Sequence, residues 1–189
     1  NLDLNGKTLT VTALDPIKNN GKMTIANGKV VAEYGENTRR CIYNYGEMTI
    51  NGVEFVQTYD KKGAAINNEG KMIINDATVT GKHGAVAAAE GDIKTVINGG
   101  TFSLMENPGV SDHCLYYVSD IKGGTFTLGN NTDSGAKVFY ESTIAEGYKA
   151  VQDGNYWFVT EDTAIIVTPE TLSSTDFNQS ATFMMVGDF

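Results

Sequence analysis

A short turn-and-strand motif recurs six times in this chain of 189 residues and constrains its fold more than any other feature. The copies begin at positions 5, 27, 51, 75, 98 and 122, so successive copies are 22, 24, 24, 23 and 24 residues apart. A repeat of this length is typical of architectures that stack one supersecondary unit on the next. The copies are Asn5-Gly6-Lys7-Thr8-Leu9, Asn27-Gly28-Lys29-Val30-Val31, Asn51-Gly52-Val53-Glu54-Phe55, Asn75-Asp76-Ala77-Thr78-Val79, Asn98-Gly99-Gly100-Thr101-Phe102 and Lys122-Gly123-Gly124-Thr125-Phe126.

Residues alternate between the two faces of a strand on both sides of each Asn-Gly corner. Before the corner, Met23-Thr24-Ile25, Met48-Thr49-Ile50 and Met72-Ile73-Ile74 predict large apolar groups that point inward. A third short strand per repeat is predicted at 41–44, 65–68, 85–88, 115–118 and 137–140. After the corner, one residue of each copy is expected to join a single inward column, which consists of Leu9, Val31, Phe55, Val79, Phe102 and Phe126.

Three short strands per turn predict an all-β fold, a right-handed parallel β-helix of about six rungs, where a rung is one turn of the coil. No segment shows apolar residues at helical spacing over three turns, so nothing could serve as a crossover helix. The corners are made by Gly and Asn, which leaves the strands their N–H donors. Asn44 and Asn68, 24 residues apart, could stack as an internal amide ladder or could simply be two polar turn residues.

The chain is expected to divide into a β-helix over 1–145, a capping hairpin over 146–160 and a tail over 161–189. The hairpin should turn at Gln152-Asp153-Gly154-Asn155 and cover the open end of the coil. Between Phe102 and Lys122, residues 104–112 have turn composition and predict the longest loop. The tail follows no rung pattern, so we expect it to pack outside the coil or to dock on a partner through Phe183, Met184, Met185 and Phe189.

The two cysteines, Cys41 and Cys114, are expected to be free thiols. They occupy comparable strand positions three rungs apart, which separates them by roughly 14 Å at ~4.8 Å per rung. A disulfide requires Cα atoms within about 7 Å of each other. His113 adjoins Cys114, but adjacent residues of a strand point to opposite faces, so this pair is not predicted to be catalytic. We identify no cofactor and no metal-ligating set.

Composition excludes some partners. The formal charge is −9, and the only arginines, Arg39 and Arg40, are adjacent, so no basic stripe could follow a nucleic-acid backbone. No run of about 18 apolar residues occurs, and membrane insertion is therefore not expected. Because the chain opens at Asn1 without a Met or a signal sequence, we expect it to be a processed or excised piece of something longer.

The Asn98-Gly99-Gly100-Thr101-Phe102 motif, the opening Asp3-Leu4-Asn5-Gly6-Lys7-Thr8-Leu9-Thr10 and the repeat length resemble right-handed parallel β-helix proteins of the pectate-lyase-like superfamily. More narrowly, they are similar to β-helix modules of gut bacterial surface proteins and of the phages that infect such bacteria. The resemblance covers residues 1–145, and Glu146-Gly147-Tyr148-Lys149-Ala150-Val151 is similar to the segments that close such modules. It implies an extracellular, virion or cell-surface location and a role as enzyme, adhesin, fibre or spacer.

The residues favour a non-catalytic structural or adhesive module of a phage virion appendage or bacterial surface protein. Beside the inward column only one carboxylate, Glu54, is expected to face outward, whereas lyases of acidic polysaccharides use acidic clusters with a base and hydrolases use two carboxylates. A polysaccharide lyase or glycoside hydrolase is the alternative. An ice-binding protein is a minor one, because four copies carry Thr-x-Thr or Thr-x-Ser while Val30/Ala32 and Glu54/Val56 interrupt the rows.

A cell-surface glycan is the first partner to test. Sugar sites use exposed aromatic rings for stacking and nearby carboxylates or amides for hydroxyl groups. Other structural proteins and self-association, for example as a trimer, are further expected partners. The candidate binding residues are Tyr43, Tyr59, Tyr116, Tyr117, Asp112 and His113.

Overall fold

The computed structural model describes residues 1–12, 17–33, 40–58, 63–91, 94–105, 113–130, 135–175, 177 and 181–187. In these residues the chain is nearly all β, with two short 3₁₀ helices, η1 (Glu141–Thr143) and η2 (Leu172–Ser174). Parallel coils stack into a β-solenoid of about four turns, so the predicted all-β parallel architecture is confirmed. The turn count is lower than six because residues 137–140, beside the last motif, form no strand, and the first motif contributes only the short β1 (Leu2–Asp3) and β2 (Thr8–Val11).

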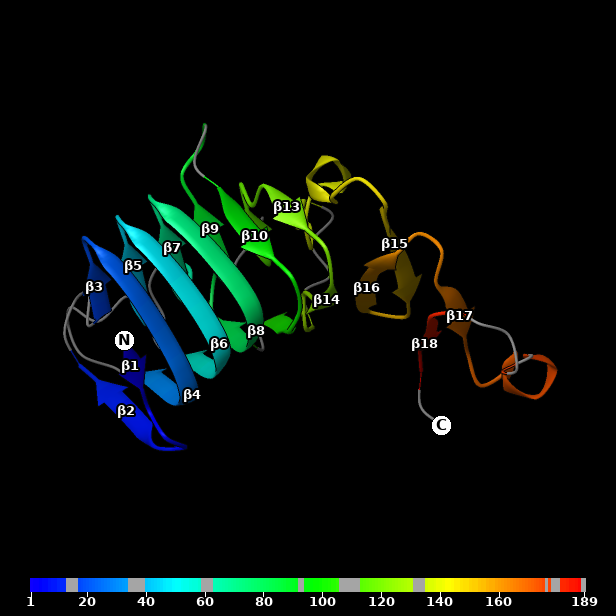
Figure 1. Ribbon diagram of the computed structural model, residues 1–189, viewed down its shortest axis with the longest axis horizontal. Helices are drawn as coiled ribbons and strands as arrows, with labels where there is room; N and C mark the ends of the chain where they lie inside the picture. The colour runs from blue at the N-terminus through cyan, green and yellow to red at the C-terminus, as the bar shows by residue number, and fades with distance from the viewer. Residues whose placement is uncertain are drawn as a thin grey trace.

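Two sheets form the walls of the coil, and Figure 1 shows their strands stacked side by side. The smaller sheet, here the third face, runs in the order β12-β9-β7-β5-β3. Its strands are β3 (Ile17–Asn19), β5 (Ile42–Asn44), β7 (Ile66–Asn68), β9 (Val86–Ala88) and β12 (Leu115–Tyr116). The larger sheet adds to β1 and β2 the strands β4 (Lys22–Ala32), β6 (Glu47–Gln57), β8 (Lys71–Gly81), β10 (Thr95–Ile97), β11 (Thr101–Leu104), β13 (Asp120–Ile121), β14 (Gly124–Thr127), β15 (Tyr148–Asp153) and β16 (Tyr156–Glu161).

The larger sheet covers two sides of the coil because β4, β6 and β8 each continue for 11 residues through the predicted corner. Residues 22–26, 47–51 and 71–75 belong to the first face, together with β1, β10 and β13. Residues 28–32, 53–57 and 77–81 belong to the second face, together with β2, β11 and β14. The bend falls at a left-handed residue, Asn27 (φ 56) in β4 and Gly52 (φ 60) in β6.

The inward column forms as a single file, with one correction. Leu9 pairs with Val30, Val30 with Phe55, and the register continues to the end of the coil. Val30 is fully buried, whereas Val31 points outward, so the prediction of Val31 was wrong by one residue. The slip arises because Asn27 itself takes the left-handed corner position that Gly52 takes one rung later. The column consists of Leu9, Val30, Phe55, Val79, Phe102 and Phe126.

A ladder of buried amides runs along the coil behind the third face. Asn19 Nδ2 donates to Asn44 Oδ1 at 2.7 Å, Asn44 Nδ2 to Asn68 Oδ1 at 2.6 Å, and Asn68 Nδ2 to Thr95 Oγ1 at 2.8 Å. Each of the three Asn side chains also donates to the carbonyl two residues ahead. Of the two interpretations that the sequence left open for Asn44 and Asn68, the structure shows the stacked amide ladder, which extends one rung in each direction.

Glycine at the corner between the third and first faces lets successive rungs approach closely. A Cβ built on Gly46 would overlap the carbonyl oxygen of Gly21, and one built on Gly70 would overlap that of Gly46. Gly21 itself has open space around its missing Cβ. Glycine is therefore required at this corner only where the backbone of a preceding rung contacts it, as at Gly46 and Gly70.

The C-terminal end of the coil is covered by the hairpin of β15 and β16, which turns at Gly154 and Asn155 as predicted. The strand β16 pairs antiparallel with β14, so the parallel stacking stops there. Trp157 lies opposite Phe126 in this pairing. The tail forms a separate parallel pair, β17 (Ile165–Val167) and β18 (Phe183–Met185), beyond the hairpin in Figure 1.

Replacing Asn44 with Ala should lower the free energy of unfolding by about 3 kcal/mol, because it removes three hydrogen bonds of this buried side chain, those with Asn19, Asn68 and Lys71, at about 1 kcal/mol each. Urea unfolding followed by circular dichroism measures the change. The matched control is Asn67→Ala, since Asn67 pairs beside Asn68 in the same strand but points outward. Equal losses for the two variants would contradict a stabilising ladder.

Gly46→Ala should destabilise the coil by about 3 kcal/mol or more, because two backbones would have to separate, whereas Gly21→Ala should change stability by less than about 1 kcal/mol. Thermal melting of both variants tests this. A Gly46→Ala protein that melts with the wild type would show that the rungs are not in van der Waals contact at this corner.

Candidate functional site

The structure does not gather the predicted binding residues into one site. Tyr59, Asp112 and Phe189 lie outside the described residues. Tyr43 and Tyr116 belong to one outward row of the third face, but two rungs lie between them, so they are roughly 14 Å apart at ~4.8 Å per rung. They form the centres of two separate aromatic groups.

The first group surrounds Tyr43. Its ring stacks on Tyr45 with centroids 4.5 Å apart, Arg40 lies over it at 4.6 Å, and Lys18 lies over the Tyr45 ring at 4.9 Å. The Tyr43 hydroxyl donates to Glu69, and this hydrogen bond to a carboxylate raises the pKa of Tyr43 above its usual range. Since a ring and a cation already lie against Tyr43, these contacts compete with a sugar for its surface.

The second group surrounds Tyr116. The buried His113 ring stacks on the Tyr116 ring with centroids 4.9 Å apart, and His113 N donates to the Tyr116 hydroxyl. His113 Nε2 and the Tyr140 hydroxyl are 3.1 Å apart. Tyr117 is half exposed and has a left-handed backbone, φ 51, which is uncommon for an aromatic residue. The contacts of His113 with Tyr116 and Tyr140 thus form one packed group, and Tyr117 is the exposed ring beside it in the sequence.

The second face carries the predicted outward rows with a shifted interruption, except that Thr127, which pairs with Tyr156 of β16, is buried. Lys29 and Val31 point outward in β4, whereas Val30 and Ala32 are buried, so the sequence assignment of that rung was wrong by one residue. Lys29 Nζ and Glu54 Oε1 form an ion pair at 2.7 Å. The carboxylate expected on this face is thus held by a neighbouring lysine.

Both cysteines are free, as predicted, and both are fully buried. Three ladder steps join them, because Cys41 N donates to Ala65, Ala65 N to Gly84, and Ala85 N to Cys114. Burial raises the pKa of Cys41 to about 12 and moves the pKa of Cys114 in the same direction. A buried, protonated thiol is a poor nucleophile.

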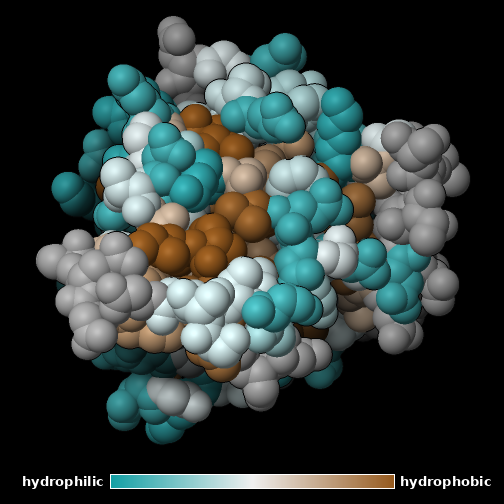
Figure 2. Space-filling model, turned by 90° about the vertical axis from the view of Figure 1, so that its right-hand side faces the viewer, coloured by the Kyte–Doolittle hydropathy of each residue, from teal (hydrophilic) through white to brown (hydrophobic). Residues whose placement is uncertain are grey.

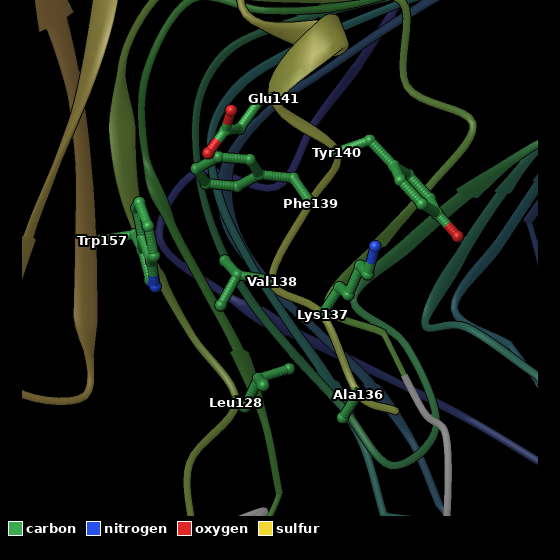
Figure 3. Close-up of a pocket in the computed structure, with 8 residues that line it drawn as sticks. All are labelled: Leu128, Ala136, Lys137, Val138, Phe139, Tyr140, Glu141 and Trp157. Atoms are coloured by element: carbon green, nitrogen blue, oxygen red, sulfur yellow. The ribbon is translucent and has the colours of Figure 1, made fainter. Parts of the chain in front are cut away.

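A pocket of about 450 Å³ lies at the C-terminal end of the coil. Figure 3 shows Trp157 on one side, Lys137 and Tyr140 on the other, and Val138 between them. The strand predicted at 137–140 does not form; Lys137 and Val138 only accept backbone hydrogen bonds from Cys114 and Leu115. Because this segment leaves the rung pattern, its side chains line the pocket, while Val138 and Phe139 are also buried against the core. The lining is Leu128, Ala136, Lys137, Val138, Phe139, Tyr140, Glu141 and Trp157.

Aromatic contacts set the inner wall of this pocket. Phe139 meets Phe126 edge to face at 5.3 Å and Trp157 at 5.7 Å, which links the pocket to the last residue of the inward column. Lys137 Nζ lies 5.0 Å above the Tyr140 ring. The pocket is thus apolar inside, with an ammonium group, a hydroxyl and the exposed carboxylate of Glu141 among its lining groups.

Sequence reasoning missed this pocket because it assigned Trp157 to the cap and residues 137–140 to a strand. The sequence feature that could have indicated the pocket is the only Trp, Trp157, together with residues 137–141, which carry two charges and depart from the alternation of the repeat. In the described part of the chain, no three His, Cys, Asp or Glu side chains form a group that could hold a metal ion. No helix there is long and apolar enough to cross a membrane.

Comparisons of the chain with models of protein families, with curated proteins and with solved structures find no match. The protein is therefore classified by its fold alone, as a β-solenoid.

Neither thiol should react with Ellman's reagent in the native protein at pH 8, because both are buried and protonated. Two thiols per chain should react after unfolding in guanidinium. Absorbance at 412 nm records the release of the coloured product. Rapid stoichiometric labelling of the native chain would contradict the burial of Cys41 and Cys114.

Proposed function

We propose that this chain is a non-catalytic structural and adhesive β-solenoid module of a phage virion appendage or bacterial surface protein, and that it binds glycan in the pocket beside Trp157. The observation that carries the proposal is an aromatic-walled pocket with polar groups among its lining, mounted at the end of a continuous parallel ladder. A stiff coil keeps such a site in its binding geometry, which reduces the entropy lost on binding.

The pocket has the size and chemistry that sugar recognition requires. Its volume of about 450 Å³ falls within the range of small-molecule sites, about 300–1,000 Å³. Trp157 supplies apolar surface for the C–H face of a sugar ring, and the buried Phe139 ring packs against Trp157. Lys137 can donate hydrogen bonds to sugar oxygens, and Glu141 can accept them from hydroxyl groups.

The chemistry of the pocket favours binding over cleavage. Glu141 is the single carboxylate among the lining residues that the structure describes, whereas most glycoside hydrolases use two. The resemblance to pectate-lyase-like proteins supports the extracellular or virion setting that we propose. The glycan partner is supported by the lining of the pocket and not by the resemblance.

Glycan-array screening followed by calorimetry tests the proposal. Glu141→Gln and Lys137→Gln should each weaken binding of a captured glycan about tenfold, which corresponds to about 1.4 kcal/mol. Glu146→Gln and Lys122→Gln remove the same charges at exposed positions outside the pocket and should change affinity less than twofold.

Two outcomes would overturn the proposal. The first is an array without any bound glycan, or binding that all four variants retain equally. The second is release of reducing ends, or a rise in ultraviolet absorbance, from uronate polysaccharides, which would identify a hydrolase or a lyase.

A further inference from the structure

The negative charge of this protein is concentrated at its C-terminal end. Residues 150–189 contain six acidic residues and no Lys, Arg or His, so they carry −6 of the net −9. The preceding 149 residues contain all 14 basic residues against 17 acidic ones and are nearly balanced. The acidic residues of the end segment are Asp153, Glu161, Asp162, Glu170, Asp176 and Asp188.

The same end exposes large apolar side chains. In the described part of the tail, Leu172, Phe177 and Met185 are 40%, 49% and 48% exposed. Figure 2 views the molecule from this end and shows apolar side chains gathered near the centre, with hydrophilic ones around them. Exposed apolar groups that gather on one face commonly mark an interaction surface.

The tail sheet is also too small to be stable by itself. It has two parallel strands of three residues each, β17 and β18, and pairs with no other described strand. Sheets of two strands are marginal in water and gain stability from a further strand or a packed layer. Their outer edges present backbone groups to which another chain can add a strand.

A hollow of about 520 Å³ lies between the tail and the hairpin turn. Its walls include Met185 from β18 and the rings of Tyr156 and Phe158 from β16, whose centroids are 6.5 Å apart. Tyr156 is half exposed. Asp153 is the single charged residue among the described lining residues. Aromatic walls with one carboxylate fit a long apolar side chain that ends in a cation.

We propose that this hollow binds a lysine or arginine side chain of a partner protein, which lays a basic, apolar segment along the tail. Charge complementarity selects this occupant, because residues 150–189 contain six carboxylates, against which the adjoining Lys149 brings one ammonium group, bound to the Asp162 and Ala164 carbonyls. A second copy of the chain would bring the same negative end to the contact and be repelled. The inference does not depend on the glycan pocket, whose lining shares no residue with the hollow.

The test uses the full chain and two labelled eight-residue peptides, one alternating Lys with Val and one alternating Glu with Val. Fluorescence anisotropy at 50 and 300 mM salt should show binding of the lysine peptide only, and this binding should weaken at the higher salt concentration. Asp153→Asn should reduce its affinity about tenfold, and Met185→Gln about fivefold. Circular dichroism verifies that both variants remain folded.

Glu170→Gln is the matched control, since it removes one exposed carboxylate of the same segment outside the hollow and should change affinity less than twofold. Glu141→Gln should leave peptide binding unchanged, which separates this result from the glycan test. Failure of the lysine peptide to bind, equal binding of the glutamate peptide, or equal effects of Asp153→Asn and Glu170→Gln would each overturn the proposal. Concentration-dependent dimers or trimers in sedimentation that Met185→Gln abolishes would also overturn it, in favour of a second copy.

Discussion

The parallel backbone ladder is the constraint on which the rest of this structure depends. It places equivalent residues of successive rungs directly above one another, at about 4.8 Å. The interior is then filled by columns of stacked apolar residues, such as Ile25, Ile50, Ile74 and Ile97 on the first face. The corner glycines follow from the same spacing, because at Gly46 and Gly70 no room remains for a Cβ.

The sequence predicts the parts of the fold that this constraint repeats. Period and alternation locate β4, β6 and β8 and four of the five third-face strands, but they miss β3 and place a strand at 137–140 that does not form. The Asp-Gly turn signal locates the capping hairpin. Period and alternation do not locate the corner to the residue, since Asn and Gly both adopt left-handed backbone and the motif contains both; Val30 and Val31 were exchanged for this reason. The repeat does not predict the number of turns either. The outermost motifs have a neighbouring rung on one side only, and they do not form complete turns.

The candidate site was less predictable because it lies where the repeat fails. Residue type identified Tyr43 and Tyr116 as candidates. Whether a ligand can reach each ring depends on contacts with neighbours such as Tyr45 and His113, which the alternation of the sequence does not predict. The pocket is built by residues 136–141, which break the pattern, and by Trp157, which the hairpin brings back over the last rung. Such long-range placement follows from packing at the end of the coil.

The amide ladder has a direction that affects how its members can move. From Asn19 to Thr95 every amide nitrogen points toward the higher-numbered rung and every amide oxygen toward the lower-numbered one. Turning over Asn44 alone would set two oxygens against each other at one junction and two amino groups at the other. The three amides must therefore reverse together or not at all, so the row behaves as a single polar unit within the core.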